Sequence, residues 1–206
     1  MTPDAVLAQF ERTGGLLRGH FALSSGRHSD TYLQCAQVLQ WPDVAERLGA
    51  ALASGWHGRV DAVVGPAMGG LIIGHEVARA LGVRFLFTER VDGAMRFRRL
   101  FALQPGERVL VVEDVVTTGG SAAEAARAVA EAGGEVVGSA AIVDRRPAER
   151  AAERPVERAD GGSAGGRGAE LTALVRVEAP AWDPAACPLC AAGDPIDTPG
   201  SRHLAR

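Results

Sequence analysis

The chain has 206 residues, 47% of them hydrophobic, and a formal net charge of −3. This length suits one domain with a substantial core, and the negative balance gives no reason to expect general attraction to nucleic acid. No apolar run approaches membrane-spanning length, and the first residues lack a signal-peptide profile. We therefore expect a single cytoplasmic domain, residues 1–206, that binds neither nucleic acid nor a membrane. Three cysteines, an odd number, do not suggest a disulfide framework.

The N-terminal residues predict a helix followed by short strands. Thr2, with proline and aspartate after it, is typical of a helix start, and the glycines at 14–15 are typical of a helix end. Residues 16–35 combine alternating polarity with turn residues, which predicts short strands joined by a loop.

From residue 42 onward, amphipathic helices alternate with buried strands. The expected order is helix 42–54, strand 60–65, helix 69–82, strand 83–88, a charged loop with some hairpin character at 89–101, strand 108–113, helix 120–134 and strand 135–144. This alternation implies an α/β fold with a parallel sheet covered on both faces. Ligands of such sheets bind beyond the carboxyl ends of the strands.

Residues 146–170 consist almost entirely of Arg, Glu, Ala, Gly and Pro, with Val156 as the one large apolar residue. Such a segment cannot bury enough surface to order itself firmly, so we expect a flexible insertion. A short exposed helix over 148–158 is the alternative. A last strand is expected within 171–180, and the proline-punctuated tail, 180–206, is expected to run over the surface.

Residues 109–121, VLVVEDVVTTGGS, are the most informative stretch of the chain. Glu113 and Asp114 end a buried strand, and they can accept hydrogen bonds from sugar hydroxyls or hold a divalent metal. The residues after them can cradle a phosphate with hydroxyls and with the free N–H groups of a helix start. A diol acceptor directly before a phosphate cradle suits a ribose 5-phosphate group. The cradle would comprise Thr117, Thr118, Gly119, Gly120 and Ser121.

Two better-known phosphate sites are excluded by the sequence. A nucleotide-triphosphatase loop requires Gly-Lys-Ser/Thr, and this chain contains no lysine. A dinucleotide fingerprint places its acid after the glycines, whereas here the acids precede them. An ordinary glycine-rich turn would require neither paired acids nor three hydroxyls.

Residues 109–121 resemble the phosphoribosyl-diphosphate (PRPP) motif of the type I phosphoribosyltransferases. The resemblance implies that fold, a central parallel sheet flanked by helices, with residues 1–40 as a small base-binding hood. It also implies that Val115 and Val116 contribute to PRPP binding, and that Mg²⁺ bridges pyrophosphate and ribose oxygens without a direct side-chain ligand. Residues 65–70, GPAMGG, match the position of the family's pyrophosphate loop, where Pro66 and Ala67 would contact PRPP.

Further features resemble the orotate phosphoribosyltransferases in particular. The sequence from Ser25 to Arg27 is similar to their LKSGR segment, and Tyr32 falls where an aromatic residue would stack on the base. An Asp-Arg pair at 144–145 matches the arginine that grips the carboxylate of the base, and a guanidinium suits a carboxylate because it offers a bidentate fork. A surface salt bridge is the alternative for that arginine. The orotate contacts implied are Ser25, Tyr32, Thr117 and Arg145.

Residues 89–101 resemble the mobile loop that closes over pyrophosphate in these enzymes, commonly in the neighbouring subunit's site. The resemblance implies a homodimer with shared active sites, with Arg90 and Arg96 contacting PRPP. Arginine is a poor proton donor, so help to the leaving group would be electrostatic. A solvated basic loop is the alternative for Arg98 and Arg99. The catalytic residues implied are Glu113, Asp114 and Arg90.

Cys187 and Cys190 have the spacing of a metal knuckle, but a zinc ion wants four ligands. Cys35, His203 or a symmetry-related pair could complete a weak zinc site, and a metal-free surface turn is the alternative. The five histidines show no ligand spacing, and we expect them to be ordinary polar residues.

Together the motifs predict transfer of ribose 5-phosphate from PRPP to orotate, giving orotidine 5′-monophosphate and pyrophosphate, the penultimate step of UMP synthesis. One alternative is a phosphoribosyltransferase for another base. A second is a PRPP-sensing regulator that binds nucleic acid, although the chain has neither a spare N-terminal domain nor a positive balance.

Overall fold

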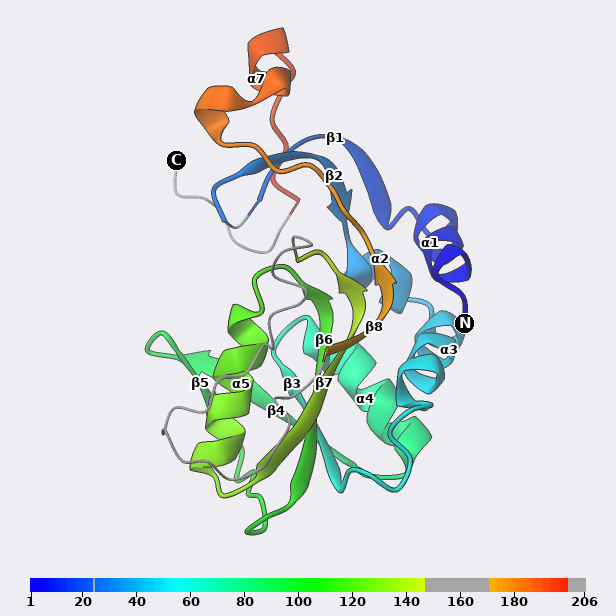
Figure 1. Cartoon of the computed structure of the whole chain (residues 1–206), viewed down its shortest axis with the longest axis vertical. Coiled ribbons are helices and arrows are strands. Elements are labelled where there is room, and N and C mark those ends of the chain that lie inside the picture. The colour runs from blue at the N-terminus through cyan, green and yellow to red at the C-terminus, as the bar shows by residue number, and fades with distance from the viewer. Residues whose placement is uncertain (24, 147–170, 200–206) are drawn as a thin grey trace.

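A six-stranded sheet flanked by helices forms the body of the protein, and a two-stranded sheet lies above it (Figure 1). The computed structural model describes residues 1–23, 25–146 and 171–199. Residues 147–170 of the insertion expected at 146–170, and the last residues of the tail, 200–206, lie outside these residues. The elements are α1 (Pro3–Arg12), β1 (Leu16–Ala22), β2 (His28–Leu33), α2 (Cys35–Leu39), α3 (Pro42–Ala53), β3 (Ala62–Pro66), α4 (Gly70–Leu81), β4 (Arg84–Val91), β5 (Ala94–Phe97), β6 (Arg108–Val116), α5 (Gly120–Glu131), β7 (Glu135–Asp144), β8 (Leu171–Arg176), a short 3₁₀ helix η1 (Pro184–Ala186) and α7 (Pro188–Ala192).

The large sheet has the strand order β5-β4-β3-β6-β7-β8, and all neighbouring strands are parallel except the edge pair β4–β5. The predicted parallel sheet is therefore confirmed. The segment expected as a charged loop at 89–101 instead forms most of an antiparallel hairpin, in which Glu89 pairs with Arg96. The hairpin character was anticipated, but the extension of β4 as far as Val91 was not.

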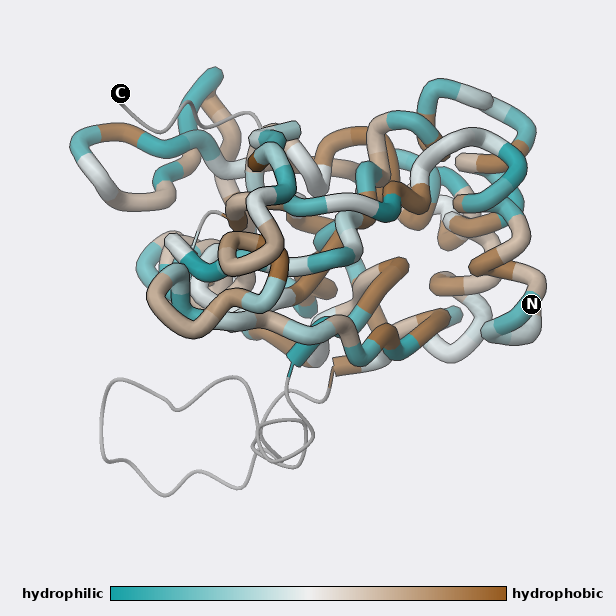
Figure 2. Tube along the Cα trace, turned by 90° about the horizontal axis from the view of Figure 1, so that it is seen from above, coloured by the Kyte–Doolittle hydropathy of each residue, from teal (hydrophilic) through white to brown (hydrophobic). Residues whose placement is uncertain are grey.

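Helices cover both faces of the sheet. Because successive side chains of a strand point to opposite faces, each strand contributes to both cores. In β6, Leu110 and Val112 join the core that includes α1, α3 and α4, whereas Val109 and Val111 pack on the side of α5. Hydrophobic and hydrophilic residues alternate along the helices (Figure 2), as expected of helices with one buried face. The near-continuous valine and leucine run of β6 follows from this double coverage.

The N-terminal residues form the expected helix and a hood. The Thr2 hydroxyl accepts a hydrogen bond from the Ala5 N–H at 3.3 Å, which caps α1 as predicted. Strands β1 and β2 pair antiparallel as a separate sheet, with Leu17 opposite Tyr32. Figure 1 shows this hood above the carboxyl ends of β6 and β7, the side on which ligands of parallel sheets bind. The short helix α2, which follows directly, was not predicted.

The C-terminal segment lies against the hood rather than running independently over the surface. The backbone N–H groups of His28 and Trp182 each donate to the other's carbonyl at 2.8 Å, and Phe21 forms a bridge with Asp197. Helix α7 follows the same segment and stands away from the large sheet (Figure 1). The tail is thus exposed for most of its described length but is joined to both strands of the hood.

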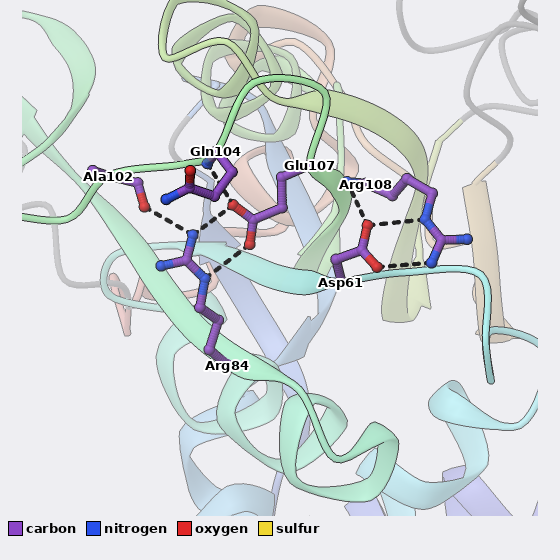
Figure 3. A network of polar contacts seen from close by, with 6 residues as sticks. All are labelled: Asp61, Arg84, Ala102, Gln104, Glu107 and Arg108. Atoms are coloured by element: carbon purple, nitrogen blue, oxygen red, sulfur yellow. Dashed lines mark hydrogen bonds and ion pairs between the residues drawn. The ribbon is translucent and has the colours of Figure 1, made fainter.

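The opposite end of the sheet is held by ion pairs (Figure 3). Arg84 donates to both carboxylate oxygens of Glu107 at 2.8 and 2.6 Å, and Arg108 donates to both oxygens of Asp61 at 2.9 and 2.7 Å. These residues start or precede β3, β4 and β6, so the pairs align the amino ends of the three central strands. Hydrogen bonds from Arg108 lower the pKa of Asp61 from 3.8 to about 2. No helix in the described part of the chain is long and apolar enough to cross a membrane.

Candidate active site

Two adjacent carboxylates lie near the carboxyl end of β6, with no cationic side chain bound to either within the described residues. Glu113 is only 8% exposed, and burial, together with the neighbouring charge of Asp114, raises its pKa well above the ordinary value. Burial also raises the pKa of Asp114, although a hydrogen bond from the Val115 N–H at 2.7 Å opposes that shift. A buried acid beside a half-buried one, with no cation bound to either, is costly, and hydroxyl donors or a divalent cation would relieve that cost.

The backbone turns sharply after β6 and opens the amino end of α5. Gly119 has φ = 81°, in the left-handed region that glycine adopts without strain, and α5 starts at the next residue. No side chain caps this helix; the nearest contact is a long one, from the Gly120 N–H to the Thr118 hydroxyl at 3.4 Å. Thr117, Thr118 and Gly120 are exposed. Unpaired N–H groups at a helix start, with hydroxyls beside them, form a site suited to a phosphate.

The loop at 65–70 abuts these acids. A Cβ atom on Gly69 would lie 2.5 Å from the Asp114 carboxylate oxygen Oδ1, so only glycine permits this approach. The Ala67 N–H donates to the Thr88 carbonyl at 2.8 Å, which fixes the loop to β4. The Ala67–Met68 peptide is cis. The structure therefore brings Pro66 and Ala67 to the same edge of the sheet as the acids, as the sequence predicted.

Arg145 extends one residue beyond β7, beside the end of the PRPP-like motif. In the register of β6 and β7, Val116 pairs with Asp144, and the Arg145 N–H donates to the Val116 carbonyl at 2.8 Å. Thr117 and Arg145 are therefore the next residues on two neighbouring strands. This adjacency agrees with the expectation that both contact the base.

The Arg145 guanidinium has no carboxylate partner among the described residues. The neighbouring acid, Asp144, is instead held by Arg146 in a buried bidentate pair with both nitrogen–oxygen distances at 3.0 Å. Arg145 makes only a long hydrogen bond, at 3.4 Å, to the Thr31 carbonyl of the hood. The surface salt bridge considered as an alternative for Arg145 is thus not formed with any residue that the structure describes. Burial lowers the pKa of Arg145, as expected for a half-buried cation without an acid.

Tyr32 of β2 lies close enough to Asp114 and Arg145 to interact with them electrostatically. Burial raises the pKa of Tyr32, the charge of Asp114 raises it further, and the charge of Arg145 acts in the opposite direction. The structure therefore brings the tyrosine of the hood, the acid of β6 and the arginine of β7 together over the carboxyl edge of the sheet.

Other predicted residues lie further from this group. Ser25 is exposed in the turn of the hood, and the contact that the structure gives its hydroxyl is with the Arg27 N–H at 3.5 Å. The Arg90 guanidinium is held by Glu124 of α5 at 2.7 Å and by the Gly93 carbonyl at 2.6 Å. Arg96 is exposed on β5.

The cysteine pair has different neighbours from those anticipated. Cys35 lies in the hydrophobic core, so it cannot complete a site with Cys187 and Cys190, and His203 lies outside the described residues. Instead His20 and His28, expected to be ordinary polar residues, lie against both cysteines. The sequence did not predict this contact, because the two histidines lie on two different strands of the hood, β1 and β2. Apart from the spacing of the cysteines themselves, the sequence carries no signal for this grouping.

Comparison with known proteins agrees with this geometry. The sequence matches the family model described as "Phosphoribosyl transferase domain" over residues 35–160. It is 48% identical over 205 residues to an orotate phosphoribosyltransferase of Pelotomaculum thermopropionicum, covering 99% of this chain and 100% of that protein. It is 50% identical over 208 residues to the enzyme of the same name from Acidithiobacillus ferrooxidans, covering 99% and 100%. The chain belongs to the orotate phosphoribosyltransferase family.

Solved structures confirm the fold of this family member. The crystal structure of orotate phosphoribosyltransferase from Aeropyrum pernix aligns with a TM-score of 0.62 at 27% identity, covering 83% of this chain and 93% of that one. Adenine phosphoribosyltransferase from Thermoanaerobacter pseudethanolicus aligns with a TM-score of 0.59 at 18% identity, which shows the shared fold alone. The type I phosphoribosyltransferase fold predicted from the motif is thus confirmed.

Proposed function

We propose that this orotate phosphoribosyltransferase transfers ribose 5-phosphate from PRPP to orotate through the residues grouped at the carboxyl edge of its sheet. The observation that carries the assignment of the base is the half-buried Arg145 guanidinium, which has no acid partner in the described structure and lies beside Tyr32. A carboxylate on the base would pair with it. Adenine, guanine and uracil offer no such group.

The two acids and the phosphate cradle would bind different parts of PRPP. Glu113 and Asp114 would accept hydrogen bonds from the 2′ and 3′ hydroxyls of the ribose, and residues 117–121 would bind the 5-phosphate. As pyrophosphate departs, positive charge builds on the ribose, and the adjacent carboxylates would stabilise it. Their burial strengthens this effect, because the surrounding dielectric constant is low. Holding both substrates in reacting geometry would supply much of the remaining acceleration.

The pyrophosphate would lie against the loop at 65–70, where Pro66 and Ala67 approach the acids. We infer that Arg90 and Arg96 reach it from the β4–β5 hairpin, with Arg90 leaving Glu124 to do so. The exposure of Arg96 and the position of this hairpin at the edge of the sheet support such a movement. Arginine remains charged throughout, so this help would be electrostatic.

Magnesium fits this chemistry because the site offers oxygen donors near a pyrophosphate. The two acids lack a cationic partner in the described residues, so the site can accept added positive charge. We propose that Mg²⁺ enters bound to PRPP oxygens rather than to protein side chains. When bound, it would neutralise the charge that develops on the leaving pyrophosphate.

We also propose that the chain acts in the cytoplasm as a homodimer with shared active sites. Exposed apolar side chains near the pyrophosphate loop, Met68 (78% exposed) and Ile72 (48% exposed), support an interface on that side. The test is to mix an inactive Asp114→Asn variant with an Arg96→Ala variant. If the hairpin of one subunit serves the site of the other, hybrid dimers regain an intact site and activity returns. Mixtures that remain as inactive as their components would refute sharing.

The assignment of the substrate is tested by base-dependent release of pyrophosphate from PRPP. We expect release with orotate and none with adenine, guanine or uracil, and the Asp114→Asn variant is the matched inactive control. Turnover with a purine would instead establish another phosphoribosyltransferase. Absent turnover with tight binding of RNA or DNA would favour the PRPP-sensing regulator.

A further inference from the structure

Four potential metal ligands from distant parts of the sequence meet between the hood and the C-terminal segment. His20 lies on β1 and His28 starts β2, whereas Cys187 caps α7 and Cys190 lies within it. One ligand atom from each residue lies within 4.8 Å of every other. His20, His28 and Cys187 are buried, with 5%, 7% and 3% of their surface exposed.

The spacing of these atoms matches the edges of a tetrahedron around one zinc ion. Zinc bonds of about 2.3 Å to sulfur and about 2.0 Å to nitrogen put a sulfur and a nitrogen ligand about 3.5 Å apart and two nitrogens about 3.3 Å apart. In the structure, His20 Nε2 lies 3.5 Å from Cys187 Sγ and 3.7 Å from Cys190 Sγ, and His28 Nδ1 lies 3.3 Å from Cys190 Sγ. The two ring nitrogens are 3.0 Å apart.

The hydrogen bond of one ring nitrogen of His20 leaves the other nitrogen free to bind a metal. His20 Nδ1 lies 2.9 Å from the Asp194 carbonyl oxygen, which only accepts, so Nδ1 carries the proton. The lone pair of Nε2 is then directed at the cysteines. A backbone carbonyl that accepts from the far nitrogen is the usual support of a metal-bound histidine.

The segment that carries the cysteines has little else to hold it in place. Over residues 183–194, Cys187 is the one buried residue, and neither η1 nor α7 buries a side chain of its own. A helix of five residues is unstable alone in water, and packing contributes almost nothing here. A bound metal would supply the missing stabilisation, as it does in small domains that fold on their ligand.

We propose that His20, His28, Cys187 and Cys190 form a structural Zn²⁺ site that fastens the C-terminal segment to the hood. Two thiolates and two imidazoles in a tetrahedron suit zinc, and four protein ligands leave no open position for chemistry. A two-iron cluster does not fit, because its ligands on separate irons would lie further apart than 4.8 Å. Binding converts the two thiols to thiolates and releases their protons to solvent.

Strand β2 connects the proposed metal site to the residues proposed to bind the base. Strand β2 starts at His28 and carries Thr31, whose carbonyl accepts from Arg145, and Tyr32. The metal would therefore fix the register of the strand that covers the base. This consequence rests on the proposed function, whereas the metal site itself does not.

The test measures metal in the full-length protein purified under reducing conditions. Elemental analysis should find about one zinc per chain in the wild type and in His57→Ala, a control that removes an exposed histidine elsewhere. Cys190→Ser and His28→Ala should each lose most of it. Because such variants can misfold, Co²⁺ is also titrated into wild-type protein stripped by a chelator, where a tetrahedral cobalt–thiolate spectrum is expected at one equivalent.

Two readouts separate this proposal from the enzymatic one. Removing zinc should lower the thermal midpoint and expose residues 183–199 to proteolysis, and zinc should restore both. With PRPP saturating, the KM for orotate should rise more than kcat falls. No bound metal and no cobalt–thiolate spectrum would overturn the site, as would a Cys187–Cys190 disulfide in freshly purified protein. Iron in place of zinc would overturn the identity of the metal. The metal content, the cobalt spectrum, the thermal midpoint and the proteolysis are independent of whether orotate is the substrate, whereas the change in KM depends on it.

Discussion

Replacing Arg145 by alanine should weaken the binding of orotate far more than the binding of PRPP. In the structure this guanidinium is half-buried, has no acid partner among the described residues, and makes one long hydrogen bond at 3.4 Å. Its removal therefore disturbs little in the free enzyme, but it leaves the carboxylate of bound orotate unpaired in a partly desolvated site. Truncation of one partner of such a pair costs about 2–4 kcal/mol. At about 1.4 kcal/mol for each factor of ten, orotate affinity should fall roughly 30- to 1,000-fold.

The decisive comparison uses uracil, which lacks the carboxylate, as a competitive inhibitor. Arg145→Ala should leave the inhibition constant of uracil within about threefold, because only the carboxylate contact is lost. The KM for PRPP should also stay nearly constant. Arg127→Ala, on an exposed position of α5, is the matched control for loss of an arginine. If Arg145→Ala weakens orotate and uracil by the same factor, the residue supports the hood rather than the carboxylate, and the reasoning above is wrong.

Three further predictions concern the acids at the two ends of the sheet. Asp114→Asn should lower kcat at least about 100-fold with an unchanged circular dichroism spectrum; near-normal turnover would remove Asp114 from the site. Glu113→Gln should stabilise the free enzyme at neutral pH, because an acid with a raised folded pKa costs stability as pH rises above its unfolded value of 4.5. Thermal midpoints between pH 5 and 8 should then fall less steeply in the variant than in the wild type, and parallel curves would contradict this. Asp61→Asn should have the opposite effect. The pKa of Asp61 is about 2 in the folded protein, against an ordinary value of 3.8. Its small contribution to folding stability is therefore present above pH 3.8 and lost as pH falls through 2. Acid titration of folding should show a smaller loss over that range in the variant, and an unchanged loss would exclude the pair with Arg108.

The sheet and its binding edge could be predicted because the signals that specify them are local. The run of valines in β6, the paired acids after it and the glycines at 119–120 each act through neighbouring residues in the chain. The parallel pairing of β6 with β7 then follows from the strand–helix–strand order, because a crossover helix such as α5 joins parallel strands. Even the hairpin at 89–101 was anticipated in part, because its turn at Asp92 and Gly93 is a local signal.

The ion-pair partners of individual side chains could not be predicted, because several neighbouring residues of suitable charge could form each pair. Asp144 has arginines at both following positions, and nothing in the sequence says that it binds Arg146 and leaves Arg145 without an acid. Likewise, Arg90 is engaged by Glu124 of α5, a residue that the strand pattern does not relate to it. The roles of Arg90, Arg96 and Ser25 therefore stay predictions.

The histidines show the same limit over a longer distance. The rings of His20 and His28 are in contact across the hood hairpin, and their closeness to Cys187 depends on a bridge between His28 and Trp182. No periodicity relates residues so far apart in sequence. A sequence can show that two cysteines have ligand spacing, but the other two ligands emerge only when the C-terminal segment is placed against β2.

The charged residues at the two ends of the sheet differ in whether they have an opposite partner, and this difference indicates which end binds a ligand. At the amino end, every charged residue of the Asp61, Arg84, Glu107 and Arg108 network has an opposite partner, so that end is complete without a ligand (Figure 3). At the carboxyl end, Glu113 is buried as an acid, Asp114 is half-buried as an acid and Arg145 is half-buried as a cation, yet these groups do not pair with one another. Folding alone would favour neutralising them, so we infer that a ligand with both hydroxyl donors and a carboxylate compensates for their cost. PRPP and orotate together provide that complement, which neither a purine nor PRPP alone would supply.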